Sequence, residues 1–407
     1  MNLWWLVAAP AALATATTLF NVVGWPRNAS VARFSRTRPP VSVLIPARNE
    51  EKNIARCVLS ILPQLRSDDE LIVCDDGSTD QTPLILRRLQ RDYRQQAGGA
   101  AAAFRVIDGR PLQAGWVGKP NACDHLAQTA GSSWWVYVDA DVEWREGALN
   151  LAWAMMRRWR ADVLTAVPEQ RCDTAAERVF MPWLDITYVS WLPMPLVWAS
   201  RDPRFLAANG QFLAVTREAM ERTGGFAAIR DQVVDDMALC RRAKLAGLRV
   251  LFADGSRLAA CRMYEGWEQI RDGFSKNLYL GIGARPAALV VVLALYAATF
   301  LVPWLLLPVA LVAVPAAVAP AAMGVVLNLV QRLVLMAQRR HHWLGALLHP
   351  VGVVGFMAIA VNSWRWFQRG RIEWSGRVYP AAPASGAAGD VAGTSARAAV
   401  TPTREAG

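Results

Sequence analysis

The segment W-W-V-Y-V-D-A-D, residues 134–141, decides the fold of this chain. Its first five residues form a short apolar run of the kind that makes a buried β-strand, and two carboxylates follow it at once. In open sheets of parallel strands, ligands collect at the carboxyl ends of the strands. Asp139 and Asp141 could therefore hold a hard divalent cation there. A lone D-x-D is a weak motif, and this one gains weight from the strand before it.

Two earlier segments repeat this arrangement of an apolar strand followed by polar residues. A strand is predicted over Val41–Ile45, before P-A-R-N-E-E at residues 46–51, and another over Leu71–Cys74, before D-D-G-S-T-D at residues 75–80. Acidic side chains at such strand ends can accept hydrogen bonds from a ribose hydroxyl or a base N–H. Taken singly, each cluster could equally be a capped loop between a strand and a helix.

Helical apolar spacing separates these strands. It predicts helices over Ile54–Leu65 and Pro83–Tyr93. Strands that alternate with helices predict an α/β domain with a mostly parallel sheet and helices on both faces.

A fourth cluster, V-V-D-D-M-A-L-C-R-R, opens a predicted helix at residues 233–242, shortly after G-G-F at residues 224–226. The dipole of a helix stabilises acids in its first turn. Ordinary N-terminal capping by Asp235 is the alternative to a catalytic role for this pair.

In this order the four clusters resemble the family 2 glycosyltransferases of GT-A fold, over roughly Val41–Leu280. That resemblance implies a Rossmann-like sheet with flanking helices, an inverting transfer of a sugar from a UDP- or GDP-sugar, and Mg²⁺ or Mn²⁺ as cofactor. It implies metal binding by Asp139 and Asp141 and a catalytic base in the late acidic pair, for which Asp236 is preferred over Asp235. The implied nucleotide-sugar-binding residues are Pro46, Arg48, Glu50, Asp75, Asp76, Lys119 and Asp139.

Three further motifs are similar to a narrower branch, the membrane glycosyltransferases associated with hopanoid and carotenoid biosynthesis. They are C-R-M-Y-E-G-W (residues 261–267), G-F-S-K-N-L-Y (273–279) and W-S-G-R-V-Y (374–379). This branch implies a lipid or isoprenoid-like acceptor. Processive polysaccharide synthases carry Q-x-x-R-W before their later spans, whereas N-S-W-R-W at residues 362–366 lacks the Gln and follows the last apolar stretch. A polysaccharide synthase and a non-catalytic membrane scaffold remain as alternatives.

The composition favours a membrane protein. Hydrophobic residues make up 54% of the 407 and concentrate in the first 26 residues and after Arg285. The formal net charge is +11, but no compact basic run with interleaved aromatics indicates nucleic-acid binding. Arginines instead flank the apolar stretches, as the positive-inside rule requires of cytoplasmic segments.

These stretches predict a multi-pass protein of the cell (inner) membrane whose catalytic domain is cytoplasmic. Residues 3–24 suit one anchor, residues 286–331 suit two spans with a break at one of four prolines, and residues 343–361 either span or re-enter. The predicted domains are a 1–26 anchor, a 27–284 GT-A domain, a 285–366 membrane region, a 367–380 basic juxtamembrane segment and a 381–407 disordered tail.

One apolar segment has two possible interpretations. Residues 181–198 are rich in tryptophan and are either a core helix or an interfacial surface that admits a lipid acceptor. The six cysteines form no C-x-x-C pair, which favours neither a zinc site nor a disulfide framework.

Overall fold

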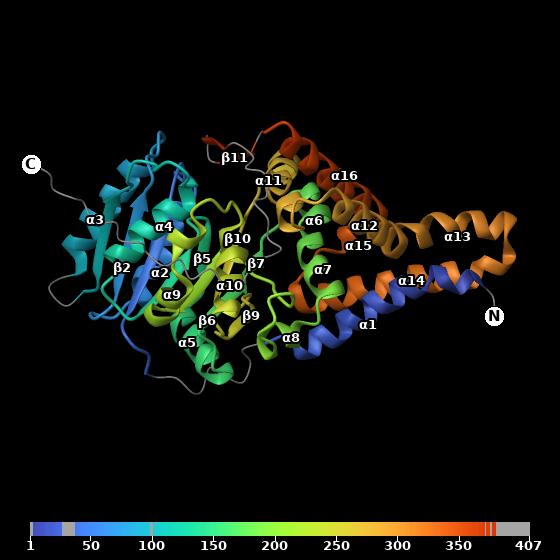
Figure 1. Cartoon of the computed structure of the whole chain (residues 1–407), viewed down its shortest axis with the longest axis horizontal. Coiled ribbons are helices and arrows are strands. Elements are labelled where there is room, and N and C mark those ends of the chain that lie inside the picture. The colour runs from blue at the N-terminus through green and yellow to red at the C-terminus, as the bar shows by residue number, and fades with distance from the viewer. Residues whose placement is uncertain (1–2, 27–36, 98–100, 371, 375–376, 380–407) are drawn as a thin grey trace, which may run out of the picture.

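The computed structural model describes residues 3–26, 37–97, 101–370, 372–374 and 377–379. A sheet-containing part lies at one end of the molecule and a helical part extends from it (Figure 1). The predicted tail at residues 381–407, four of the flanking arginines (Arg27, Arg33, Arg36, Arg371) and part of W-S-G-R-V-Y lie outside the described residues.

The central sheet of the described residues has seven strands, of which β8 runs antiparallel to its neighbours β4 and β6 while the other pairs are parallel. In spatial order they are β3 (Ala103–Asp108), β2 (Glu70–Asp75), β1 (Val41–Ala47), β4 (Trp134–Val138), β8 (Phe212–Thr216), β6 (Val163–Val167) and β9 (Val250–Asp254). The predicted mostly parallel α/β sheet and its three predicted strands are confirmed. The late antiparallel strand was not predicted.

Helices cover both faces of this sheet, as expected from the alternation. One hydrophobic core packs the sheet against α2 (Ile54–Ile61), α3 (Thr82–Ala97) and α5 (Ala148–Trp159). The other packs it against α4 (Gly118–Thr129), α9 (Arg217–Thr223), η4 (Phe226–Ile229) and α10 (Asp235–Leu245). The predicted helix over Ile54–Leu65 ends earlier, because Pro63 supplies no backbone N–H for an α-helix. The chain continues there as a 3₁₀ turn, η2 (Leu62–Gln64).

A small second sheet, β5 (Val142–Trp144), β10 (Ala259–Cys261) and β7 (Glu169–Gln170), lies beside the main one. It leads into the helical part, which includes η1 (Leu3–Val7), α1 (Ala9–Gly24), α6 (Ala175–Phe180), α7 (Pro182–Trp191), α8 (Met194–Ala199) and α11 (Gly266–Gly281). The chain continues through α12 (Pro286–Tyr296), η5 (Ala297–Leu301), α13 (Val302–Ala313), α14 (Pro315–Arg339), α15 (Trp343–Leu347), α16 (His349–Gln368), β11 (Ile372–Trp374) and β12 (Arg377–Tyr379).

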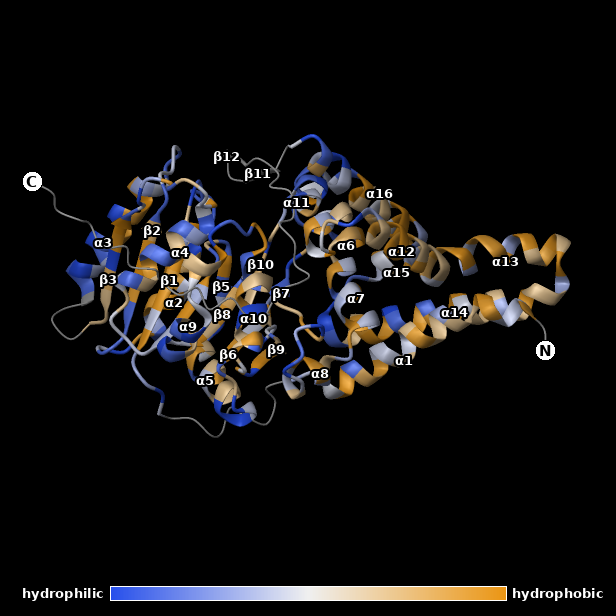
Figure 2. Cartoon of the chain, viewed as in Figure 1, coloured by the Kyte–Doolittle hydropathy of each residue, from blue (hydrophilic) through white to orange (hydrophobic). Residues whose placement is uncertain are grey.

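Two helical stretches of the described residues are long and apolar enough to cross a bilayer, judged by length and composition: Pro286–Ala313 and Pro315–Arg339. The chain breaks between them at Pro315, which occupies the first position of α14, where a missing N–H costs nothing. Pro303 stays inside the first stretch, directly after the π-helical turn η5. Figure 2 shows that α1, α13 and α14 are predominantly apolar along their projecting parts.

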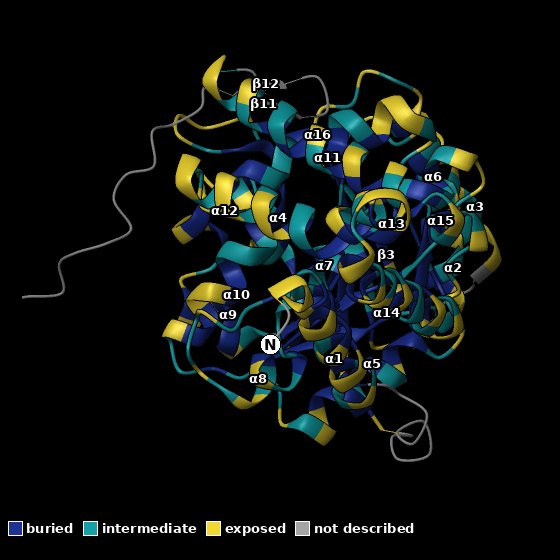
Figure 3. Ribbon diagram, turned by 90° about the vertical axis from the view of Figure 1, so that its right-hand side faces the viewer, coloured by how far each residue is buried: buried dark blue, intermediate teal, exposed yellow. Residues whose placement is uncertain are grey.

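Many residues of this projecting part are exposed (Figure 3). Leu13 on α1 is 64% exposed, and Leu311 and Val312 on α13 are 66% and 88% exposed. An apolar surface of this kind needs a cover other than water. The 16 residues of α1 fall short of the length of the other two stretches.

The tryptophan-rich segment at residues 181–198 forms α7 and α8 and lies inside the protein. Trp183 is fully buried among aromatic side chains of α12, η5 and α16, and Trp191 packs on Tyr296 and Phe300. Asn21 of α1 donates to the carbonyls of Val189 and Leu192 at 2.7 Å each. These contacts fit the core interpretation of this segment.

Candidate active site

The loops after β1 and β2 are bound to each other by hydrogen bonds. Arg48 donates to the carbonyls of Asp76 and Gly77, and the Asn49 amide N–H donates to Ser78 Oγ at 2.9 Å. Asn49 adopts a left-handed backbone, with φ 56°, which asparagine tolerates better than most residues. The first two predicted clusters therefore form one edge of the site, although Arg48 and Gly77 are 29 positions apart in the sequence.

Asp75 and Asp76 lie at the end of β2, where a third strand approaches closely. Asp75 accepts from the amide of Ser78 at 3.1 Å, and its carbonyl accepts from the amide of Gly109, just after β3, at 2.7 Å. A Cβ at position 109 would lie 2.7 Å from Asp76 Cα, so only glycine fits beside this backbone. Gly109 belongs to the same edge and was not predicted.

Lys119 joins the third and fourth clusters. It lies in the first turn of α4, and its Nζ is 2.7 Å from Asp139 Oδ1 and 3.9 Å from Asp235 Oδ2. Burial alone would lower the pKa of this amine, but the charges of Asp139 and Asp235 outweigh it and raise the pKa well above its usual value. Pro46 lines the same small cavity as these three residues and Asp236.

Asp235 and Asp236 open α10, as predicted, and differ in their surroundings. Asp235 is 8% exposed, whereas Asp236 is more accessible and its Oδ1 accepts from the Met237 amide at 2.7 Å. Burial raises the pKa of Asp235 to about 6, with Lys119 opposing the rise. Burial also raises the pKa of Asp236. A carboxylate with a raised pKa and some access to solvent is suited to general-base chemistry.

Glu50 and Asp141 complete a group of carboxylates around Asp139. Burial raises the pKa of Asp141 to about 8 and that of Glu50 to about 7, and in both cases the charge of Asp139 adds to the rise. Asp141 Oδ1 is buried and has no hydrogen-bond partner among the described residues. A positively charged ligand would relieve the repulsion between these carboxylates, so the group is a suitable binding site for a cation.

The donor set fits Mg²⁺ or Mn²⁺, which prefer carboxylate oxygens. Asp141 offers an unpartnered oxygen, and Asp139 is its electrostatic neighbour. Within the described parts of the chain, no three His, Cys, Asp or Glu side chains are grouped closely enough to hold a metal by themselves. Magnesium-type sites often take one or two carboxylates and complete their shell with substrate phosphates and water.

Two residues near the acidic pair were missed by sequence reasoning. A Cβ at Gly210, in the loop before β8, would lie 3.2 Å from Lys119 Nζ and 3.5 Å from Asp236 Cβ. Tyr188 of α7 donates to the Ala208 carbonyl at 3.3 Å, and the charge of Asp236 adds to the rise in its pKa that burial causes. The only signal for Gly210 was its position directly before an apolar strand; nothing marked Tyr188.

The predicted site residues thus converge from five segments onto one edge of the sheet. The structure brings together Pro46, Glu50, Lys119, Asp139, Asp141, Asp235 and Asp236, and places Arg48, Asp75 and Asp76 on the adjoining loops. The roles that the resemblance assigns to them remain predictions.

Known proteins share this sequence pattern and this fold. Two relatives, both named 4,4'-diaponeurosporenoate glycosyltransferase, come from Staphylococcus aureus strains USA300 and MRSA252. They are 26% and 25% identical over 349 and 346 residues, which is 83% of this chain and 88% of each relative. A solved structure, the mannosyltransferase PcManGT of Pyrobaculum calidifontis in complex with GDP-Man and Mn²⁺, is similar with a TM-score of 0.55. It is 20% identical and covers 89% of this chain and 98% of its own, a likeness that shows the fold.

A sequence model of glycosyl transferase family 2 matches residues 42–237. This range begins in β1 and ends directly after the acidic pair that opens α10, so it contains every predicted site residue. The match agrees with the order of the four clusters and with the GT-A-like sheet. The part of the chain over residues 42–237 is therefore a glycosyl transferase family 2 domain.

Proposed function

We propose that this glycosyltransferase transfers a sugar from a UDP- or GDP-sugar to a hydroxyl of a lipid or isoprenoid-like acceptor, at a membrane and with inversion at the anomeric carbon. The observation that carries the proposal is the convergence of five carboxylates at one edge of the sheet: Glu50 and Asp141 around Asp139, and Asp139, Asp235 and Asp236 around Lys119. Carboxylates at this density suit a diphosphate donor that arrives with a divalent cation.

The donor would bind across the loops after β1 and β2. Arg48 already crosses between these loops, and Asp75 and Asp76 present acceptors for ribose or base donors. PcManGT, a similar structure, contains GDP-Man and Mn²⁺, which supports a nucleotide sugar and a divalent cation here. Asp139 and Asp141 would hold the cation, whose chemistry when bound is to neutralise charge on the departing nucleoside diphosphate.

Asp236 would act as the general base. It takes the proton of the acceptor hydroxyl while that oxygen forms a bond to the anomeric carbon and the bond from this carbon to the diphosphate breaks. A single displacement of this kind inverts the anomeric centre, by the stereochemical logic of inverting glycosidases. Asp236 is preferred to Asp235 because it is more accessible and is not within 4 Å of Lys119 Nζ.

The acceptor is inferred from the helical part and from the relatives. The name 4,4'-diaponeurosporenoate glycosyltransferase gives those proteins a carotenoid-type acceptor. The outward-facing apolar side chains of α1 and α13 would lie in lipid, with the family 2 domain on the cytoplasmic side. Residues 3–24 would form one anchor, 286–313 and 315–339 two spans, and 343–361 a further span or a re-entrant segment.

The test uses the purified full chain in membranes, with Mg²⁺ or Mn²⁺, a panel of labelled nucleotide sugars and analysis of the lipid extract. We expect label in a single glycolipid and a loss of about a hundredfold or more in its formation when Asp236 is changed to Asn, because a general base supplies that much. Asp231→Asn, which removes an exposed carboxylate in the loop before α10, is the matched control. A folded Asp236→Asn enzyme with near-full turnover would exclude this base, and label in long polysaccharide would indicate a synthase.

A further inference from the structure

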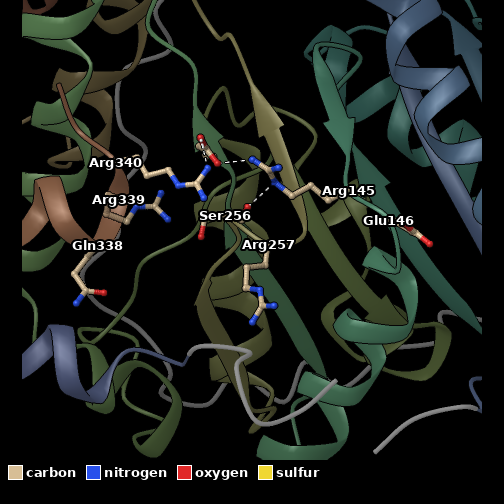
Figure 4. A pocket seen from close by; sticks show the side chains of 8 residues that line it. Arg145, Glu146, Ser256, Arg257, Gln338, Arg339 and Arg340 are labelled. Carbon is tan, nitrogen blue, oxygen red and sulfur yellow. Dashed lines mark hydrogen bonds and ion pairs between the residues drawn. The ribbon is translucent and has the colours of Figure 1, made fainter. Parts of the chain in front are cut away.

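An arginine-rich cleft lies where the end of α14 meets the small second sheet. It encloses about 370 Å³, and arginines reach it from both sides. Figure 4 shows Arg339 and Arg340 on the side of α14, opposite Arg145 and Arg257, with Ser256 between. Its lining residues are Arg145, Glu146, Glu169, Ser256, Arg257, Gln338, Arg339 and Arg340. None of them belongs to the carboxylate site described above.

Two of these arginines have guanidinium N–H groups that are available to a ligand. Arg257 is exposed, and Figure 4 shows no interaction from its guanidinium to the other lining residues. Arg340 is 76% exposed, and its ion pair with Glu169 is 3.6 Å long. Arg145 is more fully used, because its Nε donates to the Ser256 carbonyl at 2.8 Å and it also pairs with Glu169. The cleft therefore has more cationic donors than its one paired carboxylate, Glu169, satisfies.

The backbone also holds Arg340 in an uncommon conformation. Arg340 ends α14 with a left-handed φ of 57°, a conformation that favours glycine or asparagine and strains other residues. Arg339, just before it, is anchored by ion pairs with Asp185 and Asp254 and is buried. Because Arg339 fixes the end of α14, the strained turn directs Arg340 toward the cleft rather than leaving it at the end of a loose chain.

An excess of arginine donors suits an anionic ligand, and the position of the cleft indicates which kind of anion could reach it. It opens at the last turn of an apolar helix, α14, where that helix reaches the family 2 domain. On the proposed membrane placement, this level is the polar boundary of the cytoplasmic leaflet, which carries anionic phospholipids. Arginine donors match phosphate oxygens well, and a volume of this size is ample for a headgroup.

We propose that this cleft binds the phosphate-bearing headgroup of an anionic membrane phospholipid, through Arg257 and Arg340 with help from Arg145. The proposal rests on the proposed membrane location and goes beyond the transfer reaction. It assigns the cleft a lipid ligand that is neither donor nor acceptor.

The test measures binding of fluorescent phosphatidylglycerol and phosphatidylcholine to the full chain in a neutral detergent. The variant is Arg257→Gln with Arg340→Gln, and the matched control is Arg87→Gln with Arg94→Gln, which removes two exposed arginines from α3, away from the cleft. We expect wild type to prefer phosphatidylglycerol and the cleft variant to lose roughly 20-fold in affinity for it, because each arginine near such a surface contributes about fivefold. Binding of phosphatidylcholine should not change, and the control should match wild type.

Competition with inorganic phosphate and glycerol phosphate separates a lipid site from a free-phosphate site. A lipid site predicts that neither displaces phosphatidylglycerol at millimolar concentration. Equal affinity of wild type and the cleft variant for phosphatidylglycerol, or ready displacement by inorganic phosphate, would overturn the proposal. Glycosyl transfer by the cleft variant in neutral detergent should equal that of wild type. Lipid binding and glycosyl transfer are measured separately, so a wild-type chain that binds phosphatidylglycerol but transfers no sugar would contradict the proposed function and not the lipid site.

Discussion

Two clusters of charged side chains, both formed by residues distant in the sequence, differ in how their carboxylates are partnered. In the active-site cluster, Asp141 Oδ1 lacks a partner among the described residues, and burial raises the pKa of Asp141 to about 8. In the cluster at the end of α14, burial alone would raise the pKa of Asp185, but Arg339 and His341 contact it and hold the pKa well below its usual value. An unpartnered carboxylate oxygen prepares a site for a cationic ligand, whereas the fully partnered carboxylate of Asp185 joins structural elements.

The strongest test of this difference is Asp141→Asn. We expect glycosyl transfer to fall by about a hundredfold or more, because a bound cation supplies several kcal/mol of charge stabilisation. In the absence of metal, the same change should raise the melting temperature by about 2–4 °C, since it removes roughly 1 kcal/mol of buried repulsion. Activity assays and thermal unfolding of the purified chain measure the two effects. A lower melting temperature without metal would mean that Asp141 is a structural residue like Asp185.

The opposite behaviour is expected at the end of α14. Arg339→Met keeps the aliphatic stem but leaves Asp185 and Asp254 without their cation, so the chain should lose about 3–5 kcal/mol of stability. Thermal or denaturant unfolding measures the loss, and Arg340→Met, at the exposed neighbour, is the control with little expected effect. Were both variants equally stable, the cluster would not join α14 to the family 2 domain.

A smaller effect is expected from Glu177, another fully partnered carboxylate outside the active site. Burial alone would raise its pKa, but hydrogen bonds from Arg262, Thr174 and the Asp173 amide outweigh it and lower the pKa to about 2. The usual value is 4.5, so this carboxylate stabilises the fold fully above pH 4.5, and the stabilisation is lost as the pH falls toward 2.

Glu177→Gln should therefore lower stability at neutral pH and flatten the dependence of stability on pH between 4.5 and 2. Unfolding measured at a series of pH values checks this. Glu268→Gln, at an exposed position on α11, should leave the profile as in wild type. An unchanged slope in Glu177→Gln would show that the ion pair with Arg262 has no net worth.

The sequence predicted those parts of the site that a local sequence pattern marks. Asp75, Asp139 and Asp235 each follow a predicted strand or open a predicted helix, so their meeting at one edge could be expected from the parallel sheet. Gly109 and Gly210 could not, because their importance is a close approach of backbone or side chain that depends on the packed structure. Tyr188 could not either, since it reaches the acidic pair only because α7 is folded inside the protein.

The same limit applies to the helical part. The charge-free run of residues 286–331 predicted two long helices, but four prolines were equal candidates for the break. Pro315 provides it, while Pro308 and Pro320 lie inside helices and Pro303 lies in the first turn of α13. The ion pairs of Arg339 with Asp185 and Asp254 join residues 154 and 85 positions away, and no local pattern encodes such pairs.

Helix α7 limits how this enzyme could change its acceptor preference. Thr187 hydrogen-bonds Tyr296 of α12 at 2.7 Å, and the next residue, Tyr188, lies near the Asp236 carboxylate. One turn of helix thus both packs against α12 and places Tyr188 near the Asp236 carboxylate. Substitutions in this turn would disturb folding before they altered selectivity, so changes in acceptor range should come from residues elsewhere around the site.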